Sequence, residues 1–326
     1  MLLLSVVVVF AAVFALPLLP GFLEIVRPRD CKALNVDQGY VRDPHFLGES
    51  SRAKIRSYLQ ETHGQMPFLA RFLSRRSEFA FADARIEIKD GQTARNVLLA
   101  EECIVFGDGA RVLDAYSAGT MLLGNGVAAR TLLCDGPMSL GEDCRIDRWI
   151  DARGDITVGH GSVLGSSATT AQRLELSAGV RFGRAFGLPV VTLSGASTGL
   201  PGQTRANAEV VADGAQVDGD LIARRDLRIG DGCRIRGSVK AHGALVIGSG
   251  SAIAGNVIAR ADAWVGDSVT IGGHLFCEGD LRLGDGTRIG NAVRHKSVYC
   301  GKHLELGNGV RIFGWVVTEP LGRAIA

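Results

Sequence analysis

Aromatic side chains are scarce in this chain of 326 residues, of which Phe, Trp and Tyr make up only 6%. A folded core must therefore be built mainly from small aliphatic side chains. Scarce aromatics also leave no stacking platform of the kind with which proteins bind single-stranded nucleic acid. The 43 glycines, in contrast, exceed ordinary usage and indicate a backbone with many tight corners.

Positive and negative side chains are nearly balanced, because 36 Lys and Arg and 34 Asp and Glu give a net charge of only +2. We expect no nucleic-acid partner, since the basic stripe that such proteins carry is missing.

The seven cysteines are an odd number and form no Cys-x-x-Cys or Cys/His cluster. The glycine-rich stretches lack the Gly-Lys-Ser/Thr that ends a phosphate-binding loop. We therefore predict no metal site and no cofactor.

Residues 1–23 contain no charged side chain and are long enough, as a helix, to cross a bilayer. Arg27, Arg29 and Lys32 follow directly and are predicted to lie at the membrane surface. By the positive-inside rule these cations keep the rest of the chain in the cytoplasm. The alternative is a secretory signal peptide cleaved near Ala15, which the missing basic start of the segment disfavours. We predict a retained transmembrane helix.

Residues 24–83 differ in character from the rest and predict two short amphipathic helices. Apolar residues with helical spacing occur at Ile55, Tyr58 and Leu59, and again at Phe68, Leu69, Phe72 and Leu73. Basic residues are interleaved with them at Arg52, Lys54, Arg56, Arg71, Arg75 and Arg76. Two interpretations stay open: the helices lie on an anionic membrane surface, or they cap the first turn of the repeats that follow.

One short phrase recurs through the remaining chain. The stretch "LRIGDGCRIRG" at 227–237 returns as "LVIGSGSAIAG", "AWVGDSVTIGG" and "LRLGDGTRIGN". Its central aliphatic residue repeats every 17 or 18 positions, apart from a longer last step, at Ile88, Phe106, Leu123, Leu140, Val158, Leu176, Leu193, Val211, Ile229, Ile247, Val265, Leu283 and Leu306. Such self-similarity is typical of a solenoid, in which each repeat is stable only on its neighbours.

A second period divides each repeat into three parts. Apolar residues follow the central one after six and twelve positions, as at Ile235 and Ala241 after Ile229. Alternating neighbours such as Leu227 and Ile229 match short strands and exclude a helix. The sequence thus predicts an all-β, single-stranded β-helix with about 17–18 residues per coil. About thirteen coils, each about 4.8 Å from the next, would form a continuous stack about 60 Å long.

The predicted domains are a transmembrane helix at 1–23, the basic amphipathic segment at 24–83, N-terminal coils at 84–207 and C-terminal coils at 208–326. The stretch "GASTGLPGQTR" at 195–205 has the composition of an exposed loop and marks the joint between the two sets of coils.

Residues 208–290 resemble the bactofilins, bacterial polymer-forming cytoskeletal proteins. The recurring G-x-[LV]-x-A of Gly219 to Ala223, Gly237 to Ala241 and Gly255 to Ala259 carries the resemblance. It implies a right-handed β-helix, assembly into filaments through the coil ends without nucleotide, membrane association and roles in cell shape or envelope synthesis. This chain departs from the family pattern in its doubled solenoid, its spanning segment and the insert at 24–83, which would block one end.

The C-terminal tail places large apolar residues in the last coil, where a solenoid has an unpaired edge. They either cap that edge or join a second copy, and we predict a self-assembly interface formed by Phe313, Trp315, Val316 and Val317.

A hexapeptide-repeat acyltransferase acting on a membrane-linked precursor is the enzymatic alternative, because its β-helix has a similar rhythm and uses a histidine base. The candidates are His160, His242, His274 and His295, which lie at different offsets in their coils and lack an evident carboxylate partner. We predict no catalytic residue.

The expected function is a scaffold of bactofilin type in the bacterial inner membrane, with the β-helix in the cytoplasm and envelope-biogenesis proteins as partners. A non-polymerising adaptor of an envelope or polysaccharide machine is the third possibility.

Overall fold

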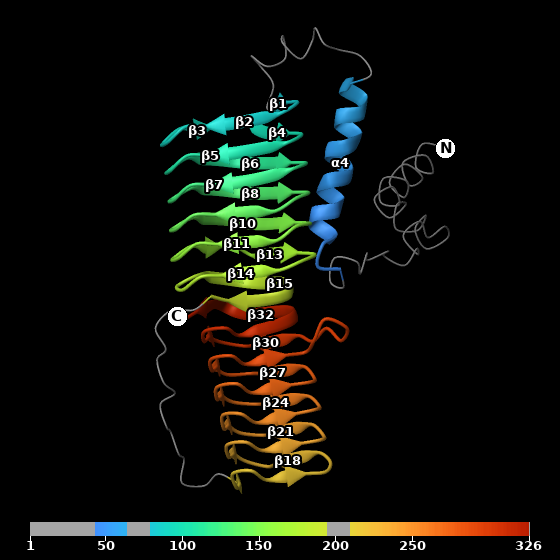
Figure 1. Ribbon diagram of the computed structural model, residues 1–326, viewed down its shortest axis with the longest axis vertical. Helices are drawn as coiled ribbons and strands as arrows, with labels where there is room; N and C mark the ends of the chain where they lie inside the picture. Colours follow the sequence, from blue (N-terminus) through green and yellow to red (C-terminus); the bar gives the residue numbers. More distant parts are fainter. Residues whose placement is uncertain (1–42, 64–78, 194–208, 326) are drawn as a thin grey trace, which may run out of the picture. The chain divides into compact units, whose positions relative to one another are not determined.

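Thirty-two strands and one long helix make up the structure, a computed structural model that describes residues 43–63, 79–193 and 209–325 (Figure 1). The predicted transmembrane helix, Arg27, Arg29, Lys32, the second amphipathic helix and the loop at 195–205 lie outside the described residues. Within the described ranges, no helix is long and apolar enough to cross a membrane.

The strands confirm the predicted all-β solenoid, which has about 13 turns of right-handed type. The first half contains β1 (Phe79–Ala82), β2 (Arg85–Ile88), β3 (Thr93–Ala94), β4 (Val97–Ala100), β5 (Cys103–Phe106), β6 (Arg111–Ser117), β7 (Thr120–Leu123), β8 (Ala128–Cys134), β9 (Met138–Leu140), β10 (Arg145–Ala152), β11 (Ile156–Val158), β12 (Val163–Leu164), β13 (Ser167–Thr170), β14 (Leu174–Leu176) and β15 (Arg181–Thr192). It begins at Phe79 rather than at 84, because β1 pairs with β4.

The second half repeats the same three-strand coil with greater regularity. Its strands are β16 (Glu209–Val211), β17 (Gln216–Val217), β18 (Leu221–Ala223), β19 (Leu227–Ile229), β20 (Arg234–Ile235), β21 (Val239–Ala241), β22 (Leu245–Ile247), β23 (Ala252–Ile253), β24 (Val257–Ala259), β25 (Ala263–Val265), β26 (Thr270–Ile271), β27 (Leu275–Cys277), β28 (Leu281–Leu283), β29 (Arg288–Ile289), β30 (Val298–Cys300), β31 (Leu304–Leu306) and β32 (Arg311–Ala324).

Inward side chains stack in ladders that form one core. Val211, Ile229 and Ile247 are register partners in consecutive coils, as the 18-residue spacing predicts. Ile247, Val265 and Leu283 continue the same ladder, each at most 1% exposed. Because one coil buries its inward residues only against the next, the stack gains its stability from repetition.

Polar and glycine residues shape the corners between strands. Asp231 accepts a hydrogen bond from the backbone N–H of Ser249 at 2.6 Å, and Ser249 Oγ accepts one from the N–H of Asp267 at 3.1 Å. A Cβ on Gly248 would lie 2.4 Å from the carbonyl carbon of Gly230, so this corner needs glycine for close stacking. Gly250 meets the other requirement, a left-handed φ of 68°.

The two halves do not follow one another in a single parallel stack but join tail to tail. β15 and β32 pair antiparallel, with Ala185 opposite Val316 and Phe186 opposite Trp315, so the halves meet at their last coils (Figure 1). The predicted step from Leu193 to Val211 is therefore wrong: one edge of β15 is bonded to β12, β13 and β14, and the other is taken by β32. The partner of Leu176 is Thr192, not Leu193.

Helix α4 (Phe46–His63) forms where the first amphipathic helix was predicted, and it lies along the flank of the first half (Figure 1). Its Ile55 packs against the outward side chains of Leu99, Tyr116 and Leu133, which are at most 5% exposed. The described helix thus covers a side of the solenoid and does not cap its first turn.

A disulfide test distinguishes the observed antiparallel junction from a parallel stack in which Val211 follows Leu193. We expect Phe186→Cys with Trp315→Cys to form an intramolecular disulfide, because opposed residues in antiparallel strands have Cα atoms within about 4.5–5.5 Å. Leu193→Cys with Val211→Cys should stay unlinked. Mass-spectrometric mapping after mild oxidation reads both pairs, and linkage of the second pair alone would contradict this topology.

Candidate functional site

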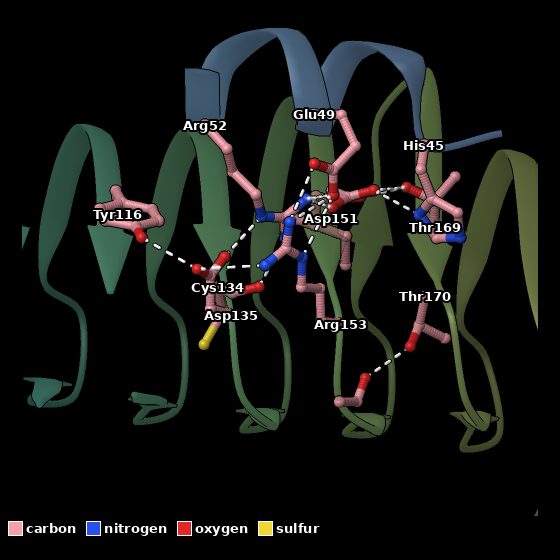
Figure 2. A network of polar contacts seen from close by, with 12 residues as sticks. His45, Glu49, Arg52, Tyr116, Cys134, Asp135, Asp151, Arg153, Thr169 and Thr170 are labelled. Carbon is pink, nitrogen blue, oxygen red and sulfur yellow. Dashed lines mark hydrogen bonds and ion pairs between the residues drawn. The ribbon is translucent and has the colours of Figure 1, made fainter. Parts of the chain in front are cut away.

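A buried polar cluster joins α4 to the first half of the solenoid (Figure 2). The outward ladder of one solenoid face supplies its floor, with Tyr116 on β6, Leu133 on β8, Asp151 on β10 and Thr169 on β13 as register partners. Asp135 follows directly after β8. The regular coil spacing therefore places two carboxylates one coil apart under the helix.

Arg52 of α4 is the centre of this cluster and has no solvent exposure. Its Nε donates to Asp135 Oδ1 and its Nη1 to Asp151 Oδ1, both at 2.5 Å. Its Nη2 donates to the backbone oxygen of Cys134 at 2.7 Å. A guanidinium is suited to such a position, because its planar fork bonds several acceptors at once. Of the two interpretations left open for this helix, the one that places Arg52 on a membrane surface does not hold, because Arg52 is buried against the solenoid.

Asp151 is nearly as buried as Arg52, with a side chain that is 1% exposed. Its second oxygen accepts a hydrogen bond from Thr169 Oγ1 at 2.6 Å and lies 3.0 Å from His45 Nδ1. Every buried side-chain nitrogen and oxygen in the described residues has a partner. The cluster thus satisfies the condition under which buried charges are tolerated.

Asp135 lies at the more exposed side of the cluster. Its Oδ2 accepts a hydrogen bond from the Tyr116 hydroxyl at 3.1 Å, and Arg56 and Arg153 approach it at 3.6 and 3.7 Å. Arg153 also forms an ion pair with Glu49 of α4 at 2.9 Å. These outer pairs are solvated and contribute less than the Arg52 contacts.

Within the cluster, Arg52 keeps its charge and Tyr116 keeps its proton at neutral pH. Burial alone would lower the pKa of Arg52, but Asp151 and Asp135 outweigh it, so the pKa is raised above the ordinary value. Burial, and then the negative charge of Asp135, raises the pKa of Tyr116 to about 12. Tyr116 therefore keeps its proton and remains a donor at neutral pH.

Gly48 allows α4 to approach this closely. A Cβ at this position would lie 2.4 Å from Cγ of Asp151 and 2.8 Å from Nη1 of Arg52. Sequence reasoning missed Gly48, His45 and the two aspartates, because the residues that meet are about 100 positions apart. The outward position of Asp151 on a strand was visible in the repeat, whereas its partner was not.

The chemistry of this cluster favours docking over catalysis. Its one thiol, Cys134, points into the coil toward the backbone oxygen of Gly119, and burial raises its pKa to about 12. A thiol of such pKa is not a nucleophile at neutral pH. In the described ranges, no group of His, Cys, Asp and Glu side chains has the arrangement of a metal site.

The histidines named as candidate bases lie on separate exposed corners. His274 Nδ1 accepts a hydrogen bond from the N–H of Ser297 at 3.0 Å, and its pKa is lowered by partial loss of surrounding water and by the positive charge of Lys296. His295 Nε2 lies 3.1 Å from the oxygen of Ala292 in the same loop, and His160 and His242 are exposed elsewhere. Among described residues, the structure brings none of the four next to a carboxylate.

The four tail residues lie at an interface inside the chain. Val316 is fully buried, Phe313 is 8% exposed, and the Trp315 ring meets Phe186 edge-on at 5.3 Å. Val317 is half-buried between its register partners in β15 and β30. A second copy could reach this strand edge only by displacing β15.

Comparison with known proteins gives no relative: no protein-family model, no curated protein and no solved structure matches the chain. No family match supports the resemblance to bactofilins, which rests on the repeat alone.

Removing the Arg52 guanidinium should release α4 from the solenoid. Arg52→Met leaves Asp151 buried without its counter-charge, a change that typically costs about 3–5 kcal/mol. We expect fast amide hydrogen exchange in α4 while β8 and β10 stay protected. Lys54→Met, an exposed change on the same helix, is the control, and unchanged protection of α4 in Arg52→Met would refute the role of this cluster.

Gly48→Ala separates helix propensity from docking. In an isolated helix this change stabilises by about 0.5–1 kcal/mol, because glycine is a poor helix former. Here the new methyl group collides with Asp151, and we expect a net loss of about 1–3 kcal/mol in the protection of α4. Hydrogen exchange of α4 measures the sign, and a gain in protection would show that the helix is not held this close.

Proposed function

We propose that the chain is a non-enzymatic, membrane-anchored scaffold that self-assembles through the open ends of its solenoid and organises cell-envelope proteins. The bactofilin-like repeat at 208–290 is one support. The anchor and the cytoplasmic position of the solenoid rest on the sequence of residues 1–32. The proposal rests mainly on the first coil of each half, where part of the apolar core stays uncovered.

The first coil of each half leaves part of the core open. Apolar residues that pack on the main core yet stay partly exposed belong, in the described residues, to these two coils: Ala80, Ile86, Ile88 and Ala94 in the first half, and Val211, Ala215, Val217 and Leu221 in the second. Within the described chain, each of the strands β16, β17 and β18 has a partner on one side only. Open edges of this kind are templates for strand addition.

The hydrogen bonds of β16 show which groups face the open side. The N–H of Glu209 donates to Asp226 and the oxygen of Val211 accepts from Gly230, both within the solenoid. Backbone groups of successive residues in a strand point to opposite sides, so the N–H and C=O of Val210 face outward. Its side chain is 69% exposed as well.

The pairing of β15 with β32 determines which ends of the solenoid can join a second copy. Because the last coils seal each other, both open ends are first coils. Contacts between copies would therefore join first coils. The predicted interface at Trp315 is replaced in this proposal by the two open coils, since its strand is already paired within the chain.

Val210→Pro is the test, because proline removes an outward N–H without breaking a bond inside the solenoid. We expect the purified full chain in detergent, examined without nucleotide by sedimentation and negative-stain electron microscopy, to form filaments or paired units. Val210→Pro should shorten or abolish them, and the control Val210→Thr should not.

Three outcomes would overturn the proposal. Single units of the unaltered chain at low and physiological salt would favour the non-polymerising adaptor. Compact trimers that bind an acyl-CoA would favour the transferase. Assemblies of unchanged size in Val210→Pro would show that β16 is not the contact.

A further inference from the structure

The second half carries an apolar ladder on its outside. We call it the outer ladder; its register partners, one per coil on strands β18, β21, β24, β27 and β30, are Ile222, Lys240, Ile258, Phe276 and Tyr299. Ile222 is 62% and Phe276 38% exposed. The rings of Phe276 and Tyr299 stack at 4.8 Å with an interplanar angle of 8°.

The neighbouring face of the same coils is different. Its outward residues on β20, β23, β26 and β29 are small or polar and exposed: Arg234, Ala252, Thr270 and Arg288. That neighbouring face thus carries no row of large apolar groups like the one on the outer ladder. On the outer ladder Ile258 and Tyr299 are half-buried beside the exposed Phe276, and apolar side chains gathered on an exposed face mark interaction sites.

The outer ladder continues the face on which α4 lies. Across the junction, Tyr299 is the register partner of Val317, and Val317 is the partner of Arg184 on β15. Phe186, two positions further on β15, meets His45, the residue just before α4, with ring centroids 5.5 Å apart. The same face thus has a helix on its first half, and the structure shows how a helix binds it.

The spacing of α4 explains why this face suits a helix. Residues 45, 48, 52 and 55 of the chain approach the solenoid, at intervals of three and four. Coils lie about 4.8 Å apart and a helix rises about 1.5 Å per residue, so about three residues pass each coil. An amphipathic helix along the solenoid therefore meets every coil with one side chain.

We propose that the outer ladder is the docking site for an amphipathic helix of a partner protein. That helix carries apolar side chains at i, i+3 or i+4 and i+7 for Tyr299, Phe276 and Ile258, and a carboxylate that meets Lys240. Its recognition mode is that of α4 with the charges exchanged, because α4 brings a cation to the carboxylates of its face.

Charge selects this occupant over a second copy of α4. Within the part of the chain that the structure describes, Lys240 has no carboxylate partner, and the exposed Arg294 and half-buried Lys296 lie in the loop that leads into β30. An α4 from another copy would place Arg52 against these cations. An acidic helix pairs with them and gains specificity from the match.

The experiment uses two synthetic peptides of about 18 residues labelled with fluorescein. Both carry leucines at the stated spacing; one has Glu and the other Lys at the position opposite Lys240. Fluorescence anisotropy with the purified full chain should show binding of the Glu peptide at least tenfold tighter than the Lys peptide. Lys240→Glu should reverse that preference, and Phe276→Glu should weaken the Glu peptide at least tenfold.

Leu122→Glu is the matched control for Phe276→Glu. Leu122 is likewise an outward apolar residue, 47% exposed, but it lies on a different face and in the first half. It should leave binding unchanged. Lys240→Glu keeps the test valid if Phe276→Glu fails to fold, since it alters only a surface charge. Equal binding of the two peptides, or equal loss in the control, would overturn the proposal.

A lipid surface is the competing occupant. If vesicles containing anionic phosphatidylglycerol displace the Glu peptide, and Phe276→Glu prevents that displacement, the face binds membrane and the proposal fails. The inference is independent of the proposed self-assembly: Val210→Pro alters the open coil and should leave peptide binding intact.

Discussion

The hydrogen bonding of each coil to the next is the constraint on which the whole structure depends. A single coil has three short strands and a few inward side chains, too little to fold alone, so its stability comes from the coils on either side. The end coils of such a stack are necessarily incomplete. This chain completes two of them by pairing β15 with β32, and leaves the first coil of each half with a core that is only partly covered.

The second constraint is that every strand has an outside as well as an inside. Inward positions must be apolar, whereas outward positions are free to vary and carry whatever the surface is used for. On the face of the first half that α4 covers, Leu99, Tyr116 and Leu133 provide apolar contact area and Asp151 provides a charge. A buried ion pair is a poor source of stability but fixes one arrangement, which suits a helix that must dock in one register.

Ends and faces thus have separate roles in the proposed scaffold. Ends extend the stack by strand pairing, which is insensitive to sequence and favours copies of one chain. Faces recognise helices through side chains, which are specific and can differ between the two halves, as the carboxylates under α4 and Lys240 on the outer ladder show. An assembling unit with such faces can bind different partners without changing how it assembles.

The sequence by itself determined the coil. Its 18-residue spacing predicted the register of Ile229, Ile247 and Val265, because each coil packs on its sequence neighbour in the same way. It also placed large apolar residues in the last coil, but not their partner: that Trp315 meets Phe186, that Val211 does not follow Leu193, and that Arg52 is buried between Asp135 and Asp151 were decided only by the tertiary structure. The repeat pattern specifies how neighbouring coils pack. The pairing of the two last coils and the docking of α4 depend on contacts between segments far apart in the sequence, which a repeat pattern does not specify.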